Sequence, residues 1–208
     1  MIFNCLITGV GGQGTELMSR LIGTAALSKG LEVRGSETAG MAQRGGSVAS
    51  HIRMGKDIHS PLIPPAKADL VIAFEPAEAV RVHTFIAPAG RMLVLDRAIM
   101  PVTGQLAARS YESEEMLAFL RTYMSRPTED HLTRKEGGEW LTAINGEELI
   151  KKCGGAGVLN TALLGTAAEK KLFPFSAEDI LAAITERIPS EYREANIRAF
   201  NAGRELAR

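Results

Sequence analysis

A glycine-rich turn, Gly-Val-Gly-Gly-Gln-Gly at residues 9–14, stands between an apolar, β-prone run at residues 2–8 and a helical pattern at residues 15–29. Glycine occupies all three positions of the fingerprint by which strand–turn–helix units bind dinucleotides. Small residues let the backbone turn sharply and approach a pyrophosphate, and the free N–H groups of the helix start favour an anion. This succession of elements indicates an α/β fold. The candidate binding residues of the turn are Gly9, Gly11, Gly12, Gln13 and Gly14.

Two interpretations of this first glycine loop remain open. The glycines could serve only the tight packing of a strand on a helix, or the loop could bind part of a nucleotide. A dinucleotide site also needs an acid about 20 residues downstream for the ribose, and Glu32 or Glu37 could serve. No Lys-Ser/Thr pair follows the loop, which excludes a P-loop. One hypothesis for the whole chain is therefore a stand-alone NAD(P)- or nucleotide-binding module.

A second glycine loop, Gly-Met-Ala-Gln-Arg-Gly-Gly-Ser at residues 40–47, is the more unusual of the two. Adjacent glycines can form a concave array of N–H donors, and an arginine beside them adds a charged fork for an anion. A plain turn is the alternative. Each loop follows a predicted strand, so both could line one site at the carboxyl edge of the sheet. The candidate residues here are Gln43, Arg44, Gly45, Gly46 and Ser47.

The rest of the chain alternates strands and helices, which predicts a three-layer α/β/α, Rossmann-like domain with a mostly parallel sheet. Continuous apolar runs at residues 68–74 and 91–95 are typical of parallel strands buried on both faces, and a helix starting at Pro76 joins them. Other strands are predicted at residues 31–36, 47–54 and 139–144, and other helices at residues 114–124, 158–171, 177–187 and 190–206. We expect one domain over residues 1–208, with a helical C-terminal extension at about 157–208.

Composition excludes several classes of function. The 208 residues carry 24 basic and 24 acidic side chains, so no net charge favours nucleic acid or an anionic membrane. Two cysteines cannot supply the four ligands of an iron–sulfur cluster or a cysteine-rich zinc site. No apolar run approaches the roughly 18 residues of a spanning helix, and the first residues lack a basic leader. We expect a cytoplasmic protein.

Four features carry weaker signals. A third glycine cluster at residues 154–157 is expected to cap the helix that starts near Val158, and Cys153 beside it is expected to be structural. Residues 112–150 hold an excess of acids, which favours a solvated surface excursion. Glu75 ends a strong strand, where sites occur, although an acid there also complements a helix dipole.

A further pair, His51 and Arg53, lies in an alternating strand. Residues two apart in a strand point to the same face, so both side chains could face a cleft together. Solvent exposure explains the pair equally well.

Several stretches of the chain together resemble the γ-subunit family of 2-oxoacid–ferredoxin oxidoreductases, and especially its indolepyruvate β subunits. The likeness covers nearly the whole chain and is weakest at residues 99–140. The stretches that carry it are residues 9–14, 40–48, 50–53, 60–64, 68–70, 75–76 and 194–200.

The resemblance implies a subunit of an enzyme that oxidatively decarboxylates an aryl 2-oxoacid to an acyl-CoA and passes electrons to ferredoxin. In this family thiamine diphosphate and [4Fe–4S] clusters do that work on a larger α subunit. The present sequence has neither the Gly-Asp-Gly of a thiamine diphosphate site nor the cysteines of a cluster. The resemblance therefore implies a non-cofactor subunit, inactive alone, whose glycine loops contact coenzyme A or the partner. The γ subunit of a pyruvate or branched-chain enzyme is the alternative.

Overall fold

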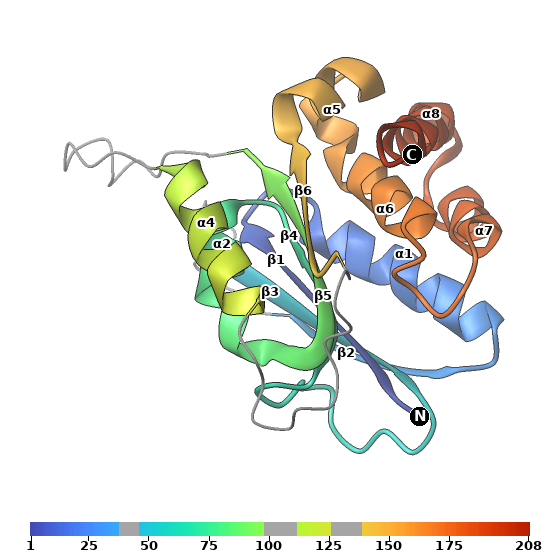
Figure 1. Cartoon of the computed structure of the whole chain (residues 1–208). Helices are drawn as coiled ribbons and strands as arrows, with labels where there is room; N and C mark the ends of the chain where they lie inside the picture. The colour runs from blue at the N-terminus through green and yellow to red at the C-terminus, as the bar shows by residue number, and fades with distance from the viewer. Residues whose placement is uncertain (38–45, 98–111, 126–138) are drawn as a thin grey trace.

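Six strands form one sheet in the order β2-β3-β1-β4-β5-β6 (Figure 1). The structure is a computed structural model, and it describes residues 1–37, 46–97, 112–125 and 139–208. Among the described strands, β3 alone runs in the direction opposite to the others, so the expected mostly parallel sheet is confirmed. The strands are β1 (Phe3–Val10), β2 (Glu32–Glu37), β3 (Ser47–Gly55), β4 (Ala68–Ala73), β5 (Ile86–Asp96) and β6 (Leu141–Asn145).

Helices cover both faces of the sheet, which gives the expected three layers (Figure 1). One face packs against α1 (Thr15–Ser28), α5 (Gly146–Cys153) and α6 (Leu159–Glu169). α7 (Ala177–Arg187) packs on α1, and α8 (Ser190–Leu206) packs on α6. The other face packs against α2 (Pro76–Arg81) and α4 (Ser113–Met124). Two short 3₁₀ turns, η2 (His83–Phe85) and η3 (Ala156–Val158), connect elements.

The central strand β4 shows why its apolar run is continuous. Leu70 and Ile72 enter the core beneath α1 and α6, whereas Val71 and Ala73 enter the core beneath α2 and α4. All four are fully buried, because helices lie on both faces of a parallel sheet. The βαβ unit predicted around Pro76 is confirmed, since β4 and β5 pair in parallel on either side of α2.

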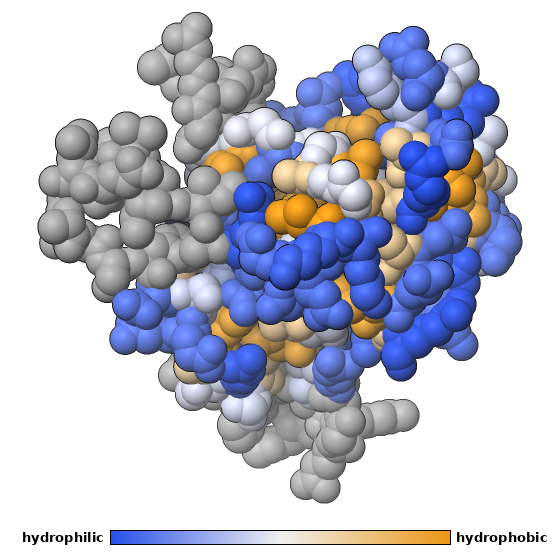
Figure 2. Space-filling model, turned by 90° about the horizontal axis from the view of Figure 1, so that it is seen from above, coloured by the Kyte–Doolittle hydropathy of each residue, from blue (hydrophilic) through white to orange (hydrophobic). Residues whose placement is uncertain are grey.

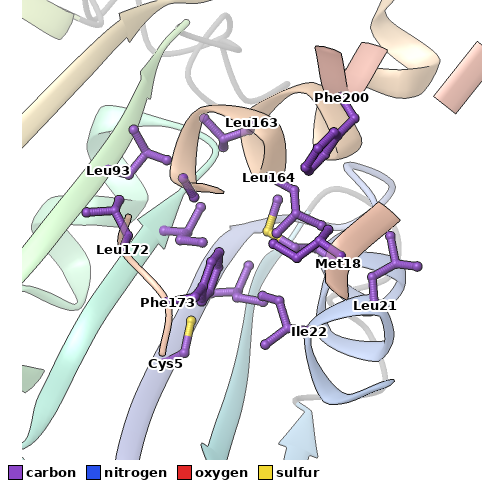
Figure 3. Close-up of a cluster of buried hydrophobic side chains, with 14 of the residues drawn as sticks. Cys5, Met18, Leu21, Ile22, Leu93, Leu163, Leu164, Leu172, Phe173 and Phe200 are labelled. Carbon is purple, nitrogen blue, oxygen red and sulfur yellow. The ribbon is translucent and has the colours of Figure 1, made fainter. Parts of the chain in front are cut away.

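The C-terminal helices belong to the principal core. In Figure 3, Leu163 and Leu164 of α6 and Phe200 of α8 gather with Met18 of α1 above the sheet. Cys5 of β1 lies in the same cluster, where burial raises the pKa of its thiol well above the usual range. That thiol therefore behaves as a small apolar side chain.

One helix escaped the sequence analysis, and it changes the role of the third glycine cluster. α5 has only eight residues, and Asn145 caps it by accepting the Glu148 N–H at 2.9 Å. Gly154 ends α5 in the left-handed region, at φ 85°. The prediction that the cluster caps the following helix is therefore wrong for Gly154, because a helix C-terminus needs a residue that tolerates positive φ.

The acidic segment at residues 112–150 is in part structural, contrary to the expected solvated excursion. α4 turns Leu117 and Leu120 into the core, and β6 forms the edge strand beside β5. The sheet needs α4 as a cover, because the face of β5 that is turned toward α4 is apolar. β6 confirms the strand predicted at residues 139–144.

Candidate functional site

The two glycine loops meet at the carboxyl edge of the parallel strands. The Gly11 N–H donates to the carbonyl oxygen of Gly46 at 3.0 Å, because β1 and β3 pair up to Val10 and Ser47. Gly46 and Ser47 are thus placed beside the first loop. Gln43, Arg44 and Gly45 lie outside the residues that the structure describes.

The Gln13 side chain braces the first loop from within. Its Oε1 accepts the Val10 N–H at 2.8 Å, and its Nε2 donates to Glu75 Oε1 at 2.7 Å. Glu75 is only 2% exposed, so the amide bridges a backbone turn to a buried carboxylate. A Cβ on Gly9 would lie 2.4 Å from Gln13 Oε1. A side chain at position 9 would therefore displace the Gln13 amide from the Val10 N–H.

Three N–H groups of the loop are already bonded within the protein. Val10 donates to the Gln13 side chain, Gly11 donates to Gly46, and the Gln13 N–H donates to the Val10 carbonyl at 3.2 Å. A pyrophosphate cradle relies on such groups being free. The geometry therefore favours a loop that is shaped by its own hydrogen bonds over the dinucleotide cradle considered from the sequence.

The strand order also places both candidate ribose-binding acids away from the position that a dinucleotide site requires. β3 lies between β1 and β2, so Glu37 at the end of β2 stands two strands away from the first loop, roughly 9.5 Å at the usual spacing. Glu32 begins β2, and its pairing with Gly55 places it at the opposite edge of the sheet. Neither candidate acid takes the position that the fingerprint requires.

A cavity of about 350 Å³ opens between the first loop, the end of β5 and the start of α6. Viewed from above, this end of the molecule shows hydrophobic atoms ringed by hydrophilic ones (Figure 2). Apolar side chains form most of its wall, and Arg97 is the charged residue in it. The lining residues are Val10, Gly11, Gly12, Gln13, Phe74, Leu95, Arg97, Ala156 and Leu159.

Sequence reasoning missed Arg97. It directly follows β5, so it lies at the same edge as the glycine loops, and its Nε stands 3.5 Å from Glu147 Oε1 at the surface. The usable signal was a base immediately after a buried parallel strand, where ligands bind in open α/β sheets.

Ser47 is engaged with a second buried carboxylate. Its Oγ donates to Glu78 Oε2, and Arg81 Nε lies 3.2 Å from Glu78 Oε1. Glu78 is 4% exposed. Together with Glu75 it places two buried carboxylates beside the meeting point of the loops, so the sequence expectation that Glu75 lies at the sheet's edge is confirmed.

His51 and Arg53 hold a loop and do not line a cleft. The Ile63 N–H donates to His51 Nδ1 at 3.1 Å. Arg53 donates from Nε to Asn4 Oδ1 and from Nη1 to the Ser60 carbonyl, both at 2.9 Å. The two side chains share a face, as the alternation predicts, but the segment between β3 and β4 folds over that face.

We expect His51 to make the protein less stable in mild acid. Burial lowers the pKa of His51, and protonation at Nδ1 would remove the acceptor of the Ile63 N–H. The stability that neutral His51 confers is therefore present above the unfolded value of about 6.5 and is lost as the pH falls through the lower folded value. Urea midpoints at pH 7.5 and 5.5 should differ less in His51→Asn than in the wild type. The exposed His59→Asn is the control, and equal pH dependence in all three proteins would contradict the assignment.

Cys153 is held in place as a structural residue. Its Sγ lies 3.3 Å from the Gly155 carbonyl oxygen and 3.7 Å from that of Ile150, and its single S–H can donate to either. In the described part of the chain, no three His, Cys, Asp or Glu side chains are grouped so as to hold a metal ion. Within the same residues, no helix is long and apolar enough to cross a membrane.

A larger depression of about 630 Å³ lies at the opposite edge, between the ends of α1 and α6 and the start of α7. Its charges neutralise one another, since Lys29 pairs with Asp179 at 3.0 Å and Arg204 pairs with Glu169 at 2.9 Å. It lies far from both glycine loops and carries no candidate chemistry.

Comparison with known proteins decides the family. The pyruvate ferredoxin/flavodoxin oxidoreductase family matches residues 4–206. The chain belongs to this family. The "indolepyruvate oxidoreductase subunit IorB" of Methanothermobacter thermautotrophicus is 36% identical over 203 residues, covering 98% of this chain and 96% of the relative. The protein of the same name from Pyrococcus horikoshii is 33% identical over 206 residues, covering 99% and 96%.

Solved structures share the fold of this family member. The γ subunit of a keto/oxoacid ferredoxin oxidoreductase from Geobacter sulfurreducens superposes with a TM-score of 0.61 at 22% identity, over 99% of this chain and 98% of that chain. Subunit PORC of the Thermotoga maritima pyruvate oxidoreductase gives 0.63 at 20% identity, over 98% and 96%. A 2-oxoglutarate:ferredoxin oxidoreductase from Magnetococcus marinus, solved with coenzyme A bound, gives 0.65 at 19% identity, over 99% of this chain but 31% of the other.

The expected family and fold are confirmed by these comparisons. The relatives are named as subunits, and the chain is a subunit of a 2-oxoacid–ferredoxin oxidoreductase. A subunit implies a partner chain.

Proposed function

We propose that the chain is the non-cofactor subunit of an indolepyruvate–ferredoxin oxidoreductase. The observation that carries this proposal is that four relatives, each 32–36% identical over at least 98% of this chain, bear the name of one indolepyruvate oxidoreductase subunit. The complex would oxidatively decarboxylate an aryl 2-oxoacid, form the acyl-CoA and reduce ferredoxin.

The donor set of this chain supports a division of labour. Cys5 is fully buried in the core, and the S–H of Cys153 lies within reach of two carbonyl oxygens of the same chain. Two thiols so placed leave cluster ligation to another polypeptide. The larger α subunit would then carry thiamine diphosphate and the [4Fe–4S] clusters, and this chain would complete the site beside it.

Coenzyme A, or a segment of the partner at the mouth of its site, is the proposed occupant of the cavity at the first loop. Phe74, Leu95 and Leu159 suit an aliphatic or flat apolar part of a ligand. Arg97 at the same cavity can pair with a phosphate through its guanidinium fork. Since the Val10, Gly11 and Gln13 N–H groups are already bonded within the protein, the loop would contribute by letting a ligand come close to its backbone. We propose that the second loop, residues 43–47, completes this site.

The purified chain should be inactive alone and active with its larger subunit. Co-expression with that subunit should yield indolepyruvate- and coenzyme A-dependent reduction of ferredoxin, whereas this chain alone should give none and show no visible chromophore. Parallel assays with pyruvate and a branched-chain 2-oxoacid test substrate class. Turnover by the isolated chain would refute the subunit assignment, and preference for pyruvate would refute only the indolepyruvate assignment.

Removing the charge of Arg97 should weaken coenzyme A binding to the assembled complex by about tenfold, equivalent to about 1.4 kcal/mol. The test is calorimetric titration of Arg97→Gln. Arg91→Gln is a matched control, because Arg91 lies on the same strand but donates to the Lys171 carbonyl at 2.9 Å, away from the cavity. Unchanged affinity in Arg97→Gln would remove that residue from the site and leave the subunit assignment intact. Arg44→Ala tests the second loop in the same way.

A further inference from the structure

A chain of buried polar side chains connects α8 to the first glycine loop through α6. Its members are Asn160 and Thr161 in the first turn of α6 and Asn196 of α8, which are 5%, 1% and 6% exposed. Buried polar groups of this kind persist only when they are hydrogen-bonded. The bonds here diverge from Thr161, which donates to both amides.

The orientation of each amide follows from its partners. Asn196 Nδ2 donates to the Tyr192 carbonyl at 2.9 Å, which leaves Asn196 Oδ1 to accept the Thr161 hydroxyl at 2.6 Å. The Thr161 N–H donates to Asn160 Oδ1 at 2.8 Å. That bond turns Asn160 Nδ2 toward the glycine loop.

At the loop, Asn160 packs directly against Gly14. Its Nδ2 donates to the Gly14 carbonyl at 3.4 Å, and a Cβ on Gly14 would lie 2.5 Å from the same nitrogen. Gly14 is the N-cap of α1 at φ 82° and is the last residue of the loop. Leu159, the neighbour of Asn160, lines the cavity. One side chain thus touches the end of the loop while its neighbour forms the cavity wall.

We propose that Asn160, oriented by Thr161 and Asn196, is a positioning residue that sets the conformation of the first glycine loop. Gly14 has a left-handed φ that only glycine adopts readily, and its carbonyl also accepts the Met18 N–H of α1 at 3.1 Å. The polar chain adds a second contact to this carbonyl from α6, which lies on the same face of the sheet as α1. What the loop binds rests on the proposed function, whereas its positioning does not.

The test compares Asn160 and two threonines of α6. Asn160→Ala removes the donor to the Gly14 carbonyl itself. Thr161→Val removes the hydroxyl that lies 2.6 Å from Asn196 Oδ1 and 3.4 Å from Asn160 Oδ1, but it keeps the backbone N–H that bonds Asn160 Oδ1. Thr161→Ser restores the hydroxyl. Thr166→Val is the control, because the Thr166 hydroxyl donates to the Gly203 carbonyl at 3.0 Å in the same α6–α8 interface, away from the loop. Thr161→Ala makes the comparison if Thr161→Val does not fold.

Two measurements separate positioning from stability. In the full-length chain, we expect the amide hydrogens of residues 9–18 to exchange about tenfold faster in Asn160→Ala and Thr161→Val than in Thr166→Val. The comparison requires that the variants unfold at the same denaturant midpoint. In the complex, KM for coenzyme A should rise about fivefold in Thr161→Val, with kcat changed less than twofold. Thr161→Ser should restore both values.

The outcomes are distinguishable. Equal exchange of the loop in Asn160→Ala and Thr166→Val would overturn the positioning role. Faster exchange with unchanged KM would support the positioning role and count against coenzyme A as the occupant of the loop.

Discussion

Replacing Gly203 by alanine is expected to destabilise the protein by about 3 kcal/mol or more, because the added methyl group would meet backbone atoms of α6. A Cβ at this position would lie 1.8 Å from the Ala162 carbonyl oxygen, and a Cβ on Gly165 would lie 2.0 Å from the Phe200 carbonyl oxygen. These glycines face each other's helices, so α6 and α8 cross in direct backbone contact. Backbone atoms cannot rotate away as a flexible side chain would.

The measurement is urea or guanidinium unfolding of Gly203→Ala beside the wild type. Gly23→Ala is the matched control, since Gly23 lies within α1 and its Cβ would meet only Val33 Cγ1 at an ordinary 3.6 Å. That change should stabilise the chain by roughly 0.5–1 kcal/mol, because alanine favours the helix. A loss below about 1 kcal/mol in Gly203→Ala would mean that the two helices can separate at little cost.

The same substitution should disturb the site. α6 carries Leu159 and Asn160 at its start, and both are placed by the contact of α6 with α8. Pushing the helices apart moves the wall of the cavity. We therefore expect Gly203→Ala to lose coenzyme A-dependent activity in the complex at temperatures where the variant remains folded.

Removing the Gln13 amide is expected to cost about 2 kcal/mol. Gln13→Ala leaves the Val10 N–H without its acceptor and takes one donor from the buried Glu75 carboxylate. Desolvated polar groups that lose a partner are costly, because the burial penalty stays while the bond is gone. Unfolding should be measured beside Glu16→Ala, whose exposed ion pair with Arg20 contributes little. Equal stability of the two variants would contradict the brace.

Gln13→Glu sharpens this test through pH. The substitution keeps an oxygen for the Val10 N–H but sets a second carboxylate where Nε2 now lies 2.7 Å from Glu75 Oε1. Two carboxylates so close cannot both ionise and instead share a proton. The variant should therefore be markedly less stable than the wild type at pH 8, and the difference should shrink toward pH 5. A pH-independent difference would show that the two side chains do not face each other.

Local sequence patterns predicted those helices and strands whose conformation depends on residues that are close together in the chain. The continuous apolar run of β4 predicted a strand buried on both faces, and the helical spacing after residue 14 predicted α1. The helix predicted at residues 177–187 is present as α7, and Ser176 before it forms a capping box with Asp179. These features depend on residues within one or two turns of each other, so a single sequence carries them.

The short, polar helix α5 was missed for the converse reason. Its eight residues begin with glycine and present charges, and only Gly146 and Leu149 are buried. Such a segment is helical because its cap and the neighbouring helices hold it, and hydrophobic periodicity does not report that.

The sequence by itself determined that this chain makes an α/β domain with glycine turns after its first two strands. It did so because alternation and apolar length reflect burial and backbone conformation. Only the tertiary structure decided what the turns can hold. Antiparallel β3 separates β1 from Glu37. The Gln13 side chain accepts the Val10 N–H of the first loop, and Arg97 lies in the cavity directly after the end of β5. Strand order and side-chain partners arise from contacts between residues distant along the chain, which no local pattern encodes.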